Sequence, residues 1–211
     1  MSNSNLQINR AIMIISGPSG SGKTSLGRAL VENDPEIVHS VSMTTRVPRE
    51  GEVEGQDYYF VDHNEFSTYV ITGQLLEFTE LYGNFYGTVK KNIENLLHQG
   101  SDVLFDIDAE GAKSIKSKMS DRVFTVFILP PSLTEIGERL RKRAQDSQMN
   151  IAHRLNSAKE EIRKCEEYDY IVVNENFDEA LLQLKMILQA ERSKRKRINN
   201  FSEYIESIIN S

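Results

Sequence analysis

The chain has 211 residues, of which 39% are hydrophobic and 27% are charged, and its formal net charge is −6. This length and mixture are typical of one soluble domain with a buried core, and the negative balance argues against a general nucleic-acid coat or a membrane-surface protein. The single cysteine, Cys165, excludes an intramolecular disulfide, and the apolar runs are too short to span a bilayer, so we expect a cytoplasmic protein without membrane or nucleic-acid partners.

Short runs rich in Val, Ile and Phe are predicted to form buried parallel strands, and helical patterns separate them. The strands are expected at 11–16, 37–41, 102–107, 123–128 and 170–173. Helices are expected at about 22–32, 87–100, 132–143 and 151–166, with a last one from near Asp178 into the 190s. The alternation predicts an α/β fold, in which helices flank a parallel sheet within one domain.

Two of these helix starts are predicted from capping residues. Thr88 is a plausible N-cap for the helix at 87–100, and "SLTE" at 132–135 matches a capping box. Residues 42–88 interrupt the rhythm, because they hold short alternating pieces separated by glycine turns. We expect a small β-rich insert there and not a separate domain.

The sequence "SGPSGSGKTSL" at 16–26 contains the complete pattern G-x-x-x-x-G-K-[ST] between a predicted strand and a predicted helix. Glycines let backbone N–H groups curl around a phosphate, and the helix presents its positive end to the anion. Lys23 can reach the β- and γ-phosphates of ATP, and the Thr24 hydroxyl can coordinate Mg²⁺. The residues expected to bind ATP are Gly17, Pro18, Ser19, Gly20, Ser21, Gly22, Lys23, Thr24 and Ser25.

A P-loop protein also needs a carboxylate near its metal, and the strand "DVLFDID" offers two, Asp106 and Asp108. Alternation along an extended chain places both on one face. A carboxylate on an apolar strand is costly unless it is paired or associated with a metal. For Asp108 a second interpretation stays open, namely that it caps a helix beginning at "DAEG".

The stretch "SMTTRVPREGEVEGQDYYF" at 42–60 mixes arginines, hydroxyls and tyrosines in a way that packing alone does not require. A nucleotide kinase must hold a second phosphorylated ligand opposite ATP. Arg46 and Arg49 offer forked, permanently charged donors that match a phosphate, and Tyr58 and Tyr86 can add hydroxyl donors. The side chains that could read a base edge are Ser42, Glu77 and Thr88.

Together, these motifs resemble those of guanylate kinases of the bacterial single-domain type. The chain carries "GPSGSGKT", "SMTTRVPREGEVEGQDYYFV", "LLEFTELYGNFYGT" and "DVLFDIDAEG" in that family's order and spacing, over roughly residues 10–190. The resemblance implies phosphoryl transfer from Mg-ATP to GMP, giving ADP and GDP, with dGMP as a second acceptor. The reaction would serve guanine nucleotide supply and GMP recycling.

The resemblance also implies residue roles. Ser42 and Glu77 resemble the family's guanine readers, with Asp108 assisting, and a carboxylate suits guanine because N1–H and the 2-amino group are adjacent donors. Asp106 falls where the family has an acid near Mg²⁺ and the acceptor, and Asn174 falls in an adenine-contacting loop. The clamp on the GMP phosphate is expected from Arg46, Arg49, Tyr58 and Tyr86.

Arginines after residue 138 resemble those that close over the transferring phosphoryl group. Arg139 and Arg143 are four apart on one helix face, and Arg154 follows a polar stretch, "AQDSQMN", which we expect to be weakly structured, as a mobile lid requires. Guanidinium groups stabilise charge on the equatorial oxygens. The residues expected to act in catalysis are Lys23, Arg46, Asp106, Arg139, Arg143 and Arg154.

The parts of the chain follow from these assignments. The core is expected at about 10–41, 89–137 and 167–197, the GMP-binding insert at about 42–88, the lid at about 138–166 and a basic tail at about 191–211. In that tail, "ERSKRKRINN" is expected to form a solvated helix face. The tail leaves homo-oligomerisation open, and the four scattered histidines are assigned to no metal.

Two other functions stay open at this point. Guanylate-kinase-like domains also serve as peptide-binding scaffolds, but those have lost parts of the ATP site, whereas Lys23 and Thr24 are present here. A related P-loop kinase could act on another phosphorylated acceptor, although Glu77 with Ser42 favours guanine.

Overall fold

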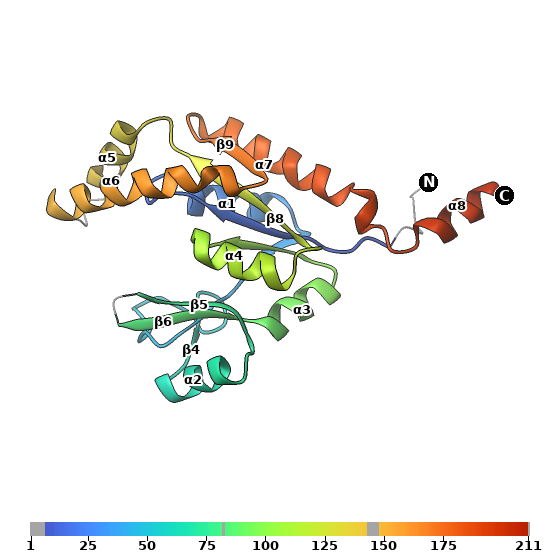
Figure 1. Ribbon diagram of the computed structural model, residues 1–211, viewed down its shortest axis with the longest axis horizontal. Helices are drawn as coiled ribbons and strands as arrows, with labels where there is room; N and C mark the ends of the chain where they lie inside the picture. Colours follow the sequence, from blue (N-terminus) through green and yellow to red (C-terminus); the bar gives the residue numbers. More distant parts are fainter. Residues whose placement is uncertain (1–6, 82, 143–147, 211) are drawn as a thin grey trace.

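The computed structural model describes residues 7–81, 83–142 and 148–210. These residues build a central five-stranded parallel sheet in the order β2-β7-β1-β8-β9 (Figure 1). The strands in that order are Ile37–His39, Asp102–Asp106, Ile12–Ser16, Val123–Leu129 and Tyr170–Val173. The predicted α/β fold is confirmed, and every predicted strand is present with slightly different ends.

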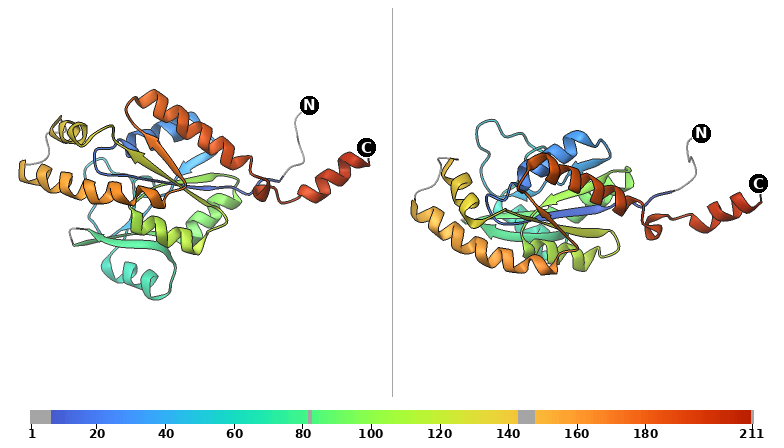
Figure 2. Two further views of the ribbon diagram at one scale, coloured as in Figure 1. Left: turned by 45° about the horizontal axis from the view of Figure 1, so that its top comes forward. Right: turned by 90° about the horizontal axis from the view of Figure 1, so that it is seen from above.

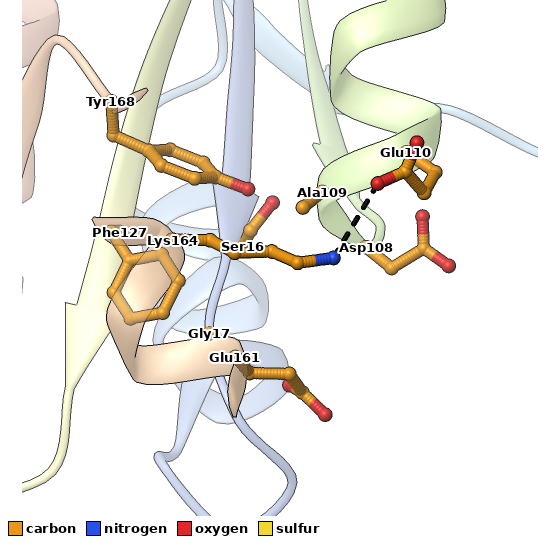
Figure 3. A pocket seen from close by; sticks show the side chains of 9 residues that line it. All are labelled: Ser16, Gly17, Asp108, Ala109, Glu110, Phe127, Glu161, Lys164 and Tyr168. Atoms are coloured by element: carbon orange, nitrogen blue, oxygen red, sulfur yellow. Dashed lines mark hydrogen bonds and ion pairs between the residues drawn. The ribbon is translucent and has the colours of Figure 1, made fainter. Parts of the chain in front are cut away.

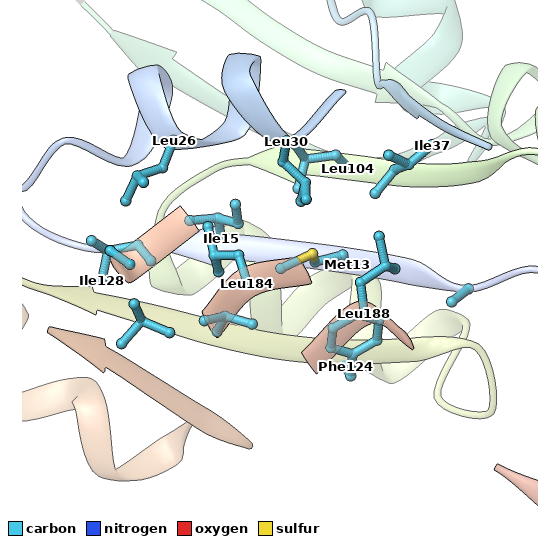
Figure 4. Close-up of a cluster of buried hydrophobic side chains, with 14 residues drawn as sticks. Met13, Ile15, Leu26, Leu30, Ile37, Leu104, Phe124, Ile128, Leu184 and Leu188 are labelled. Atoms are coloured by element: carbon cyan, nitrogen blue, oxygen red, sulfur yellow. The ribbon is translucent and has the colours of Figure 1, made fainter. Parts of the chain in front are cut away.

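Helices cover both faces of this sheet (Figure 1). α1 (Lys23–Asn33) and α7 (Phe177–Arg192) pack on one face, and α3 (Lys90–His98) and α4 (Ala109–Lys118) pack on the other. Side chains of the central strand β1 alternate between the two cores. Met13 and Ile15 enter the first core (Figure 4), and Ile12 and Ile14 enter the second. β1 is therefore buried on both sides, and the loop that follows it starts from the middle of the fold.

A second, four-stranded sheet lies beside the α4 side of the molecule, in the order β4-β3-β6-β5 (Figure 2). Its strands are Tyr59–Phe60, Met43–Thr44, Asn84–Val89 and Leu75–Leu81. A helix that the sequence analysis did not predict, α2 (His63–Ile71), packs on it through Phe66. Asp62 caps this helix by accepting a hydrogen bond from the Glu65 N–H (2.8 Å).

Two helices form an arm at the edge of the molecule (Figure 1). α5 (Leu133–Lys142) and α6 (Gln148–Arg163) pack through Ile136 and Ala158, and a 3-10 turn, η1 (Lys164–Glu167), follows. The Ser132 hydroxyl accepts from the Glu135 N–H (3.1 Å), which confirms the predicted cap. The last three residues of "AQDSQMN" differ from the expectation, because α6 already begins at Gln148, and residues 144–147 fall outside the described residues.

The prediction of Thr88 as a helix cap is wrong. α3 begins at Lys90 after Val89, and no side chain caps it. Thr88 remains in β6, where its hydroxyl donates to Glu77 (2.7 Å). The residue looked like a cap because a threonine before a helical pattern carries the same local signal in both settings.

The tail prediction is also wrong in part, since Arg192 and Arg197 are buried. Arg197 pairs with Glu191, which also accepts from Tyr170 and Lys194; we call these four residues the C-terminal charge cluster. A 3-10 turn, η2 (Arg195–Arg197), leads to α8 (Phe201–Ile209), which extends away from the body (Figure 2). None of the described helices has the length and apolar content to cross a membrane.

Candidate active site

The loop between β1 and α1 curls tightly against its neighbours. A Cβ atom at Gly17 would lie 2.5 Å from the Ile128 carbonyl oxygen, and one at Gly22, where φ is 94°, would lie 2.2 Å from Asn174 Nδ2. Neither position tolerates a side chain without displacement of backbone or of a buried amide. α1 begins at Lys23, so its N-terminal end points into the loop, as phosphate binding requires.

Two polar groups hold this loop from behind. The buried Asn174 side chain, at the end of β9, donates through Nδ2 to the Ser21 carbonyl (2.7 Å). Arg139 of α5 donates to the same carbonyl (3.5 Å) and to the Asn174 carbonyl (3.3 Å). Asn174 thus supports the P-loop main chain, in addition to bordering an open hollow of about 360 Å³. The hollow is lined by Gly20, Gly22, Ser25, Arg139, Asn174, Glu175 and Phe177.

A hydroxyl, a carboxylate and an ammonium group meet at the start of α1. The Thr24 hydroxyl donates to Asp106 Oδ2 (2.6 Å), and Lys23 Nζ lies 3.9 Å from Asp106 Oδ1. Asp106 ends β7, the neighbour of β1, so the parallel register brings it to the loop. The Thr24 and Asp106 oxygens are donors of the hard type that Mg²⁺ prefers.

The predicted phosphate clamp assembles on the second sheet. The Arg46 guanidinium lies over the Tyr58 ring, 5.4 Å from its centroid, and the Tyr58 and Tyr86 rings are 5.9 Å apart. Arg46 Nη2 donates to Glu52 (2.7 Å), which lowers the pKa of this carboxyl group. Arg49 is exposed, and its backbone N–H donates to the other oxygen of Glu52 (2.7 Å).

The predicted base readers also come together. The Glu77 carboxylate is 8% exposed and accepts from the Thr88 hydroxyl, which lies 3.3 Å from the Ser42 hydroxyl. Asp108 caps α4 by accepting from the Gly111 N–H (2.8 Å), so the capping interpretation is correct for one of its oxygens. A Cβ at Gly111 would lie 3.4 Å from Asp108 Oδ1 and 3.6 Å from Glu77 Oε2, so both carboxylates lie next to this glycine.

The pKa of Glu77 is raised, first by burial and then by the nearby charge of Asp108, while the Thr88 hydrogen bond opposes the shift. Within the described part of the chain, Glu77 has no cation in salt-bridge contact. A buried carboxylate with so few donors is poorly satisfied. A ligand that brings adjacent N–H donors would satisfy it.

The lid arginines reach the P-loop. Arg139 contacts the loop as described above and is oriented by Glu135 (2.9 Å), and Arg154 of α6 donates to the Ser19 hydroxyl (3.3 Å). Both guanidinium groups therefore lie against P-loop residues, Arg139 at the Ser21 carbonyl and Arg154 at the Ser19 hydroxyl. Arg143 falls outside the described residues.

A cavity of about 200 Å³ lies at the carboxyl end of β1, between the start of α4 and the end of α6 (Figure 3). Asp108 lines it and thus borders both this cavity and the Glu77 site. Burial raises the pKa of Glu161, which also lines the cavity, and Asp108 adds to the rise. Lys164 Nζ pairs with Glu110 (3.4 Å) across the opening.

Sequence reasoning missed two residues of this region, Glu52 and Glu161. Glu52 stands three positions after Arg49, so its spacing on a turn was available as a signal. Glu161 lies seven residues after Arg154, two helical turns along the same face, which also places it toward the P-loop. In the sequence, nothing distinguishes an acidic residue that faces the P-loop from the other acidic residues of a polar helix.

A family model described as "Guanylate kinase" matches residues 9–191. The chain is 48% identical to the guanylate kinase of Cereibacter sphaeroides over 198 residues, which cover 93% of this chain and 94% of that relative. It is 49% identical to the guanylate kinase of Rickettsia felis over 183 residues, covering 87% and 95%. The crystal structure of guanylate kinase from Anaplasma phagocytophilum is similar with a TM-score of 0.78 and 38% identity, and the match covers 98% of each chain.

Proposed function

The chain belongs to the guanylate kinase family and phosphorylates GMP to GDP at the expense of ATP, and we propose that the two sites described above hold these substrates. The P-loop takes the ATP phosphates, and the second sheet takes GMP. One observation carries this assignment most directly: the poorly satisfied Glu77 carboxylate lies beside hydroxyl groups, on the same sheet as Arg46.

On the donor side, the loop from Gly17 to Ser25 surrounds the β- and γ-phosphates. The N-terminal end of α1 and the Lys23 ammonium group supply positive charge there. The adenosine part of ATP occupies the open hollow bordered by Asn174 and Phe177. This placement is supported by the position of the hollow, which opens directly beside Gly20 and Gly22 of the loop.

The residues present fit a Mg²⁺ ion beside the P-loop. Thr24 and Asp106 supply oxygen atoms 2.6 Å apart, and Mg²⁺ is usually held by one or two protein oxygens together with substrate phosphates. Bound there, the ion would neutralise negative charge on the phosphates. Lys23 shares Asp106 in this structure and is close enough to contact the same phosphates.

On the acceptor side, Glu77 accepts from guanine N1–H and the 2-amino group, while the hydroxyl groups of Ser42 and Thr88, which lie beside the Glu77 carboxylate, contact the same base edge. Adenine offers an acceptor at N1, which would leave the buried carboxylate unpaired, so the site rejects it. Arg46, Arg49, Tyr58 and Tyr86 hold the GMP phosphate and direct one of its oxygens toward the γ-phosphate. Asp108 borders the base, and Asp106 lies where donor and acceptor phosphates meet.

During transfer, Arg139 and Arg154 stabilise the charge that spreads over the equatorial oxygens. Their present contacts with the P-loop support this role, because a phosphoryl group held by the loop lies within reach of both. Arg143, whose structure is not described, acts with them by its sequence position. Closure of α5 and α6 excludes water from the transferred group.

The proposed contacts reach the base and the phosphate of the acceptor and do not require the ribose 2′-hydroxyl. We therefore include dGMP as a second acceptor. The reducing compartment suggested by a single cysteine, together with the nucleotide substrates, supports a cytoplasmic location.

An acceptor panel tests the proposal. ADP release is coupled to a spectroscopic readout with Mg-ATP as donor and GMP, dGMP, AMP or UMP as acceptor. We expect turnover with GMP and dGMP and almost none with AMP or UMP. Absence of GMP-dependent turnover, or equal rates with AMP, would overturn the assignment of the second sheet.

A further inference from the structure

One carboxylate joins the two arginines of the phosphate clamp. Glu52 Oε1 accepts from the Arg46 guanidinium (2.7 Å), and Glu52 Oε2 accepts from the backbone N–H of Arg49 (2.7 Å). The Glu52 N–H in turn donates to the Arg49 carbonyl (3.1 Å). Gly51, with φ at 87°, gives the intervening chain the left-handed residue that such a tight turn needs. These hydrogen bonds thus connect the two ends of the segment from Arg46 to Glu52.

The Arg46 side chain is fixed by three kinds of contact. Nη2 bonds to Glu52, Nη1 donates to the Val47 carbonyl (2.8 Å), and the guanidinium plane lies over the rings of Tyr58 and Phe60 at 5.4 and 5.9 Å. Arginine has five N–H donors, so these bonds leave others for a ligand. An arginine held in this way gives up less side-chain entropy when a phosphate binds.

An alternative is that Glu52 stands in for the GMP phosphate and must leave when GMP binds. The contacts argue against this. A stand-in for the phosphate would bridge both guanidinium groups. Within the described part of the chain, Glu52 makes an ion pair with Arg46 alone; it hydrogen-bonds Arg49 at the main chain, and the Arg49 charge acts on it only from farther away. Its second oxygen closes a turn, and a displaced carboxylate would open that turn.

We propose that Glu52 is a positioning residue for the acceptor, which keeps Arg46 and Arg49 in the geometry that binds the phosphate of GMP before GMP arrives. The inference rests on the proposed function, because it takes these arginines as the phosphate clamp. Glu52 itself touches no reacting atom. Its effect is confined to the acceptor phosphate and does not extend to the base or to ATP.

The first test compares Glu52→Gln with wild type. The amide keeps the shape but loses the charge-assisted bond to Arg46 or the bond to the Arg49 N–H, so KM for GMP should rise about tenfold while KM for ATP stays unchanged. Glu50→Gln is the matched control, because it removes the same charge from an exposed glutamate two residues away. It should leave both KM values unchanged. A lower KM for GMP in Glu52→Gln would favour the stand-in alternative and overturn the proposal.

The second test isolates the phosphate by calorimetry with GMP and with guanosine, which lacks it. In Glu52→Gln, affinity for GMP should fall about tenfold and affinity for guanosine should not change. Equal losses for both ligands would show a general disturbance of the insert and contradict the positioning role. If wild type bound GMP and guanosine with equal affinity, the proposed phosphate clamp itself would be wrong. If wild type bound GMP more tightly than guanosine and the variant kept the same ratio of affinities, only the inference on Glu52 would be wrong.

A double variant completes the design. In an Arg46→Ala background, Glu52 has lost one of the two arginines that it positions, so Glu52→Gln should lower GMP affinity by a smaller factor than it does in the wild-type background. Full additivity of the two changes would mean that Glu52 acts independently of Arg46, and the proposal would be wrong. A melting temperature within a few degrees of wild type confirms that each variant is folded.

Discussion

Two buried glutamates in different parts of the molecule have pKa values shifted in opposite directions. Glu77 in the second sheet is 8% exposed, accepts from Thr88, and has a raised pKa because burial dominates. Glu191 in the C-terminal charge cluster is 1% exposed; burial alone would raise its pKa, but bonds from Lys194, Tyr170 and Arg197 together lower it. The protein supplies donors to Glu191 and leaves Glu77 short of them. Under the proposed function, guanine brings the donors that Glu77 lacks.

The arginines of the two regions differ in the same way. Arg197 is 1% exposed and uses all three guanidinium nitrogens on protein acceptors: Nε on the Glu191 carbonyl, Nη2 on its carboxylate and Nη1 on the Arg122 carbonyl. Arg46 keeps 13% of its side chain exposed and retains donors for a ligand. The number of satisfied donors, more than charge or burial alone, separates a structural arginine from a ligand-binding one.

The largest expected effect comes from a cation on the ligand-binding side. Lys23→Ala should lower kcat by about 10³-fold, because a fixed positive charge at the transferring phosphates is lost. The melting temperature should stay close to that of wild type, since the ammonium group serves an anion absent from the free protein. Steady-state kinetics and thermal unfolding measure the two quantities. A melting temperature that fell in proportion to activity would contradict the distinction between the P-loop, where charges serve a ligand, and the C-terminal charge cluster, where they serve stability.

The next effect is on stability, from the structural side. Arg197→Ala should lower the free energy of unfolding by about 3 kcal/mol, because it leaves buried partners unsatisfied. Denaturant unfolding measures the change, with Lys196→Ala as the control of equal charge at an exposed neighbour. Activity of the folded Arg197→Ala fraction should match wild type, since the cluster lies at the end of β1 away from the P-loop. A loss of kcat at unchanged stability would reverse this assignment.

Selectivity provides the third test. Glu77→Gln should reduce the preference for GMP over AMP by about 10²-fold, because the amide retains one acceptor oxygen but presents an NH₂ group to the guanine donors. The ratio of kcat/KM values for the two acceptors measures this. Stability should be maintained or improved, because a poorly satisfied buried carboxylate is removed. An unchanged preference would mean that the base is read elsewhere.

The smallest effect is the pH dependence of stability, and its sign should differ between the two glutamates. For Glu77 the native state binds a proton more readily than the unfolded chain, so its contribution to stability is lost as pH rises above the ordinary value of 4.5. For Glu191 the native pKa is lowered, so its contribution is present above 4.5 and is lost as pH falls below that value.

Unfolding free energies of Glu77→Gln and Glu191→Gln, measured from pH 3.5 to 7.5 and compared with wild type, test these signs. The Glu77→Gln variant should gain relative to wild type as pH rises. The deficit of Glu191→Gln should shrink as pH falls. The total change across each titration amounts to about 1.4 kcal/mol for one unit of pKa shift. Slopes of the same sign would refute the contrast between the two sites.

The sequence predicted the central sheet and the residues that the structure gathers around the P-loop because these depend on local patterns. The P-loop needs its glycines and Lys23 in a fixed order, and β1 needs a continuous apolar run. The burial of Arg192 could not be predicted in this way. Its partners Asp34 and Asp102 lie 158 and 90 residues away in the chain. A basic run therefore looks solvated until the fold brings distant acids to it.

Local signals also misled where one residue type serves two purposes. Thr88 matches a helix cap, yet its hydroxyl is taken by Glu77 across the second sheet. At α2 the opposite error occurred, because a true helix start was overlooked. Asp62 and Glu65 match a helix start, but they lie in a segment dominated by strand patterns. A threonine hydroxyl has one donor and two acceptor positions, and only the tertiary structure decides which groups they reach.

α6 connects two places that the reaction must coordinate. Near its start, Arg154 contacts Ser19 of the P-loop, and just past its end Lys164 pairs with Glu110 of α4. These residues are ten positions apart, a span of about 15 Å along a helix that cannot shorten. If Lys164 kept its place, a tilt of this helix by about 20° would move Arg154 by about 5 Å, at a rise of 1.5 Å per residue. Under the proposed function, so small a rotation would withdraw the Arg154 guanidinium from the phosphates.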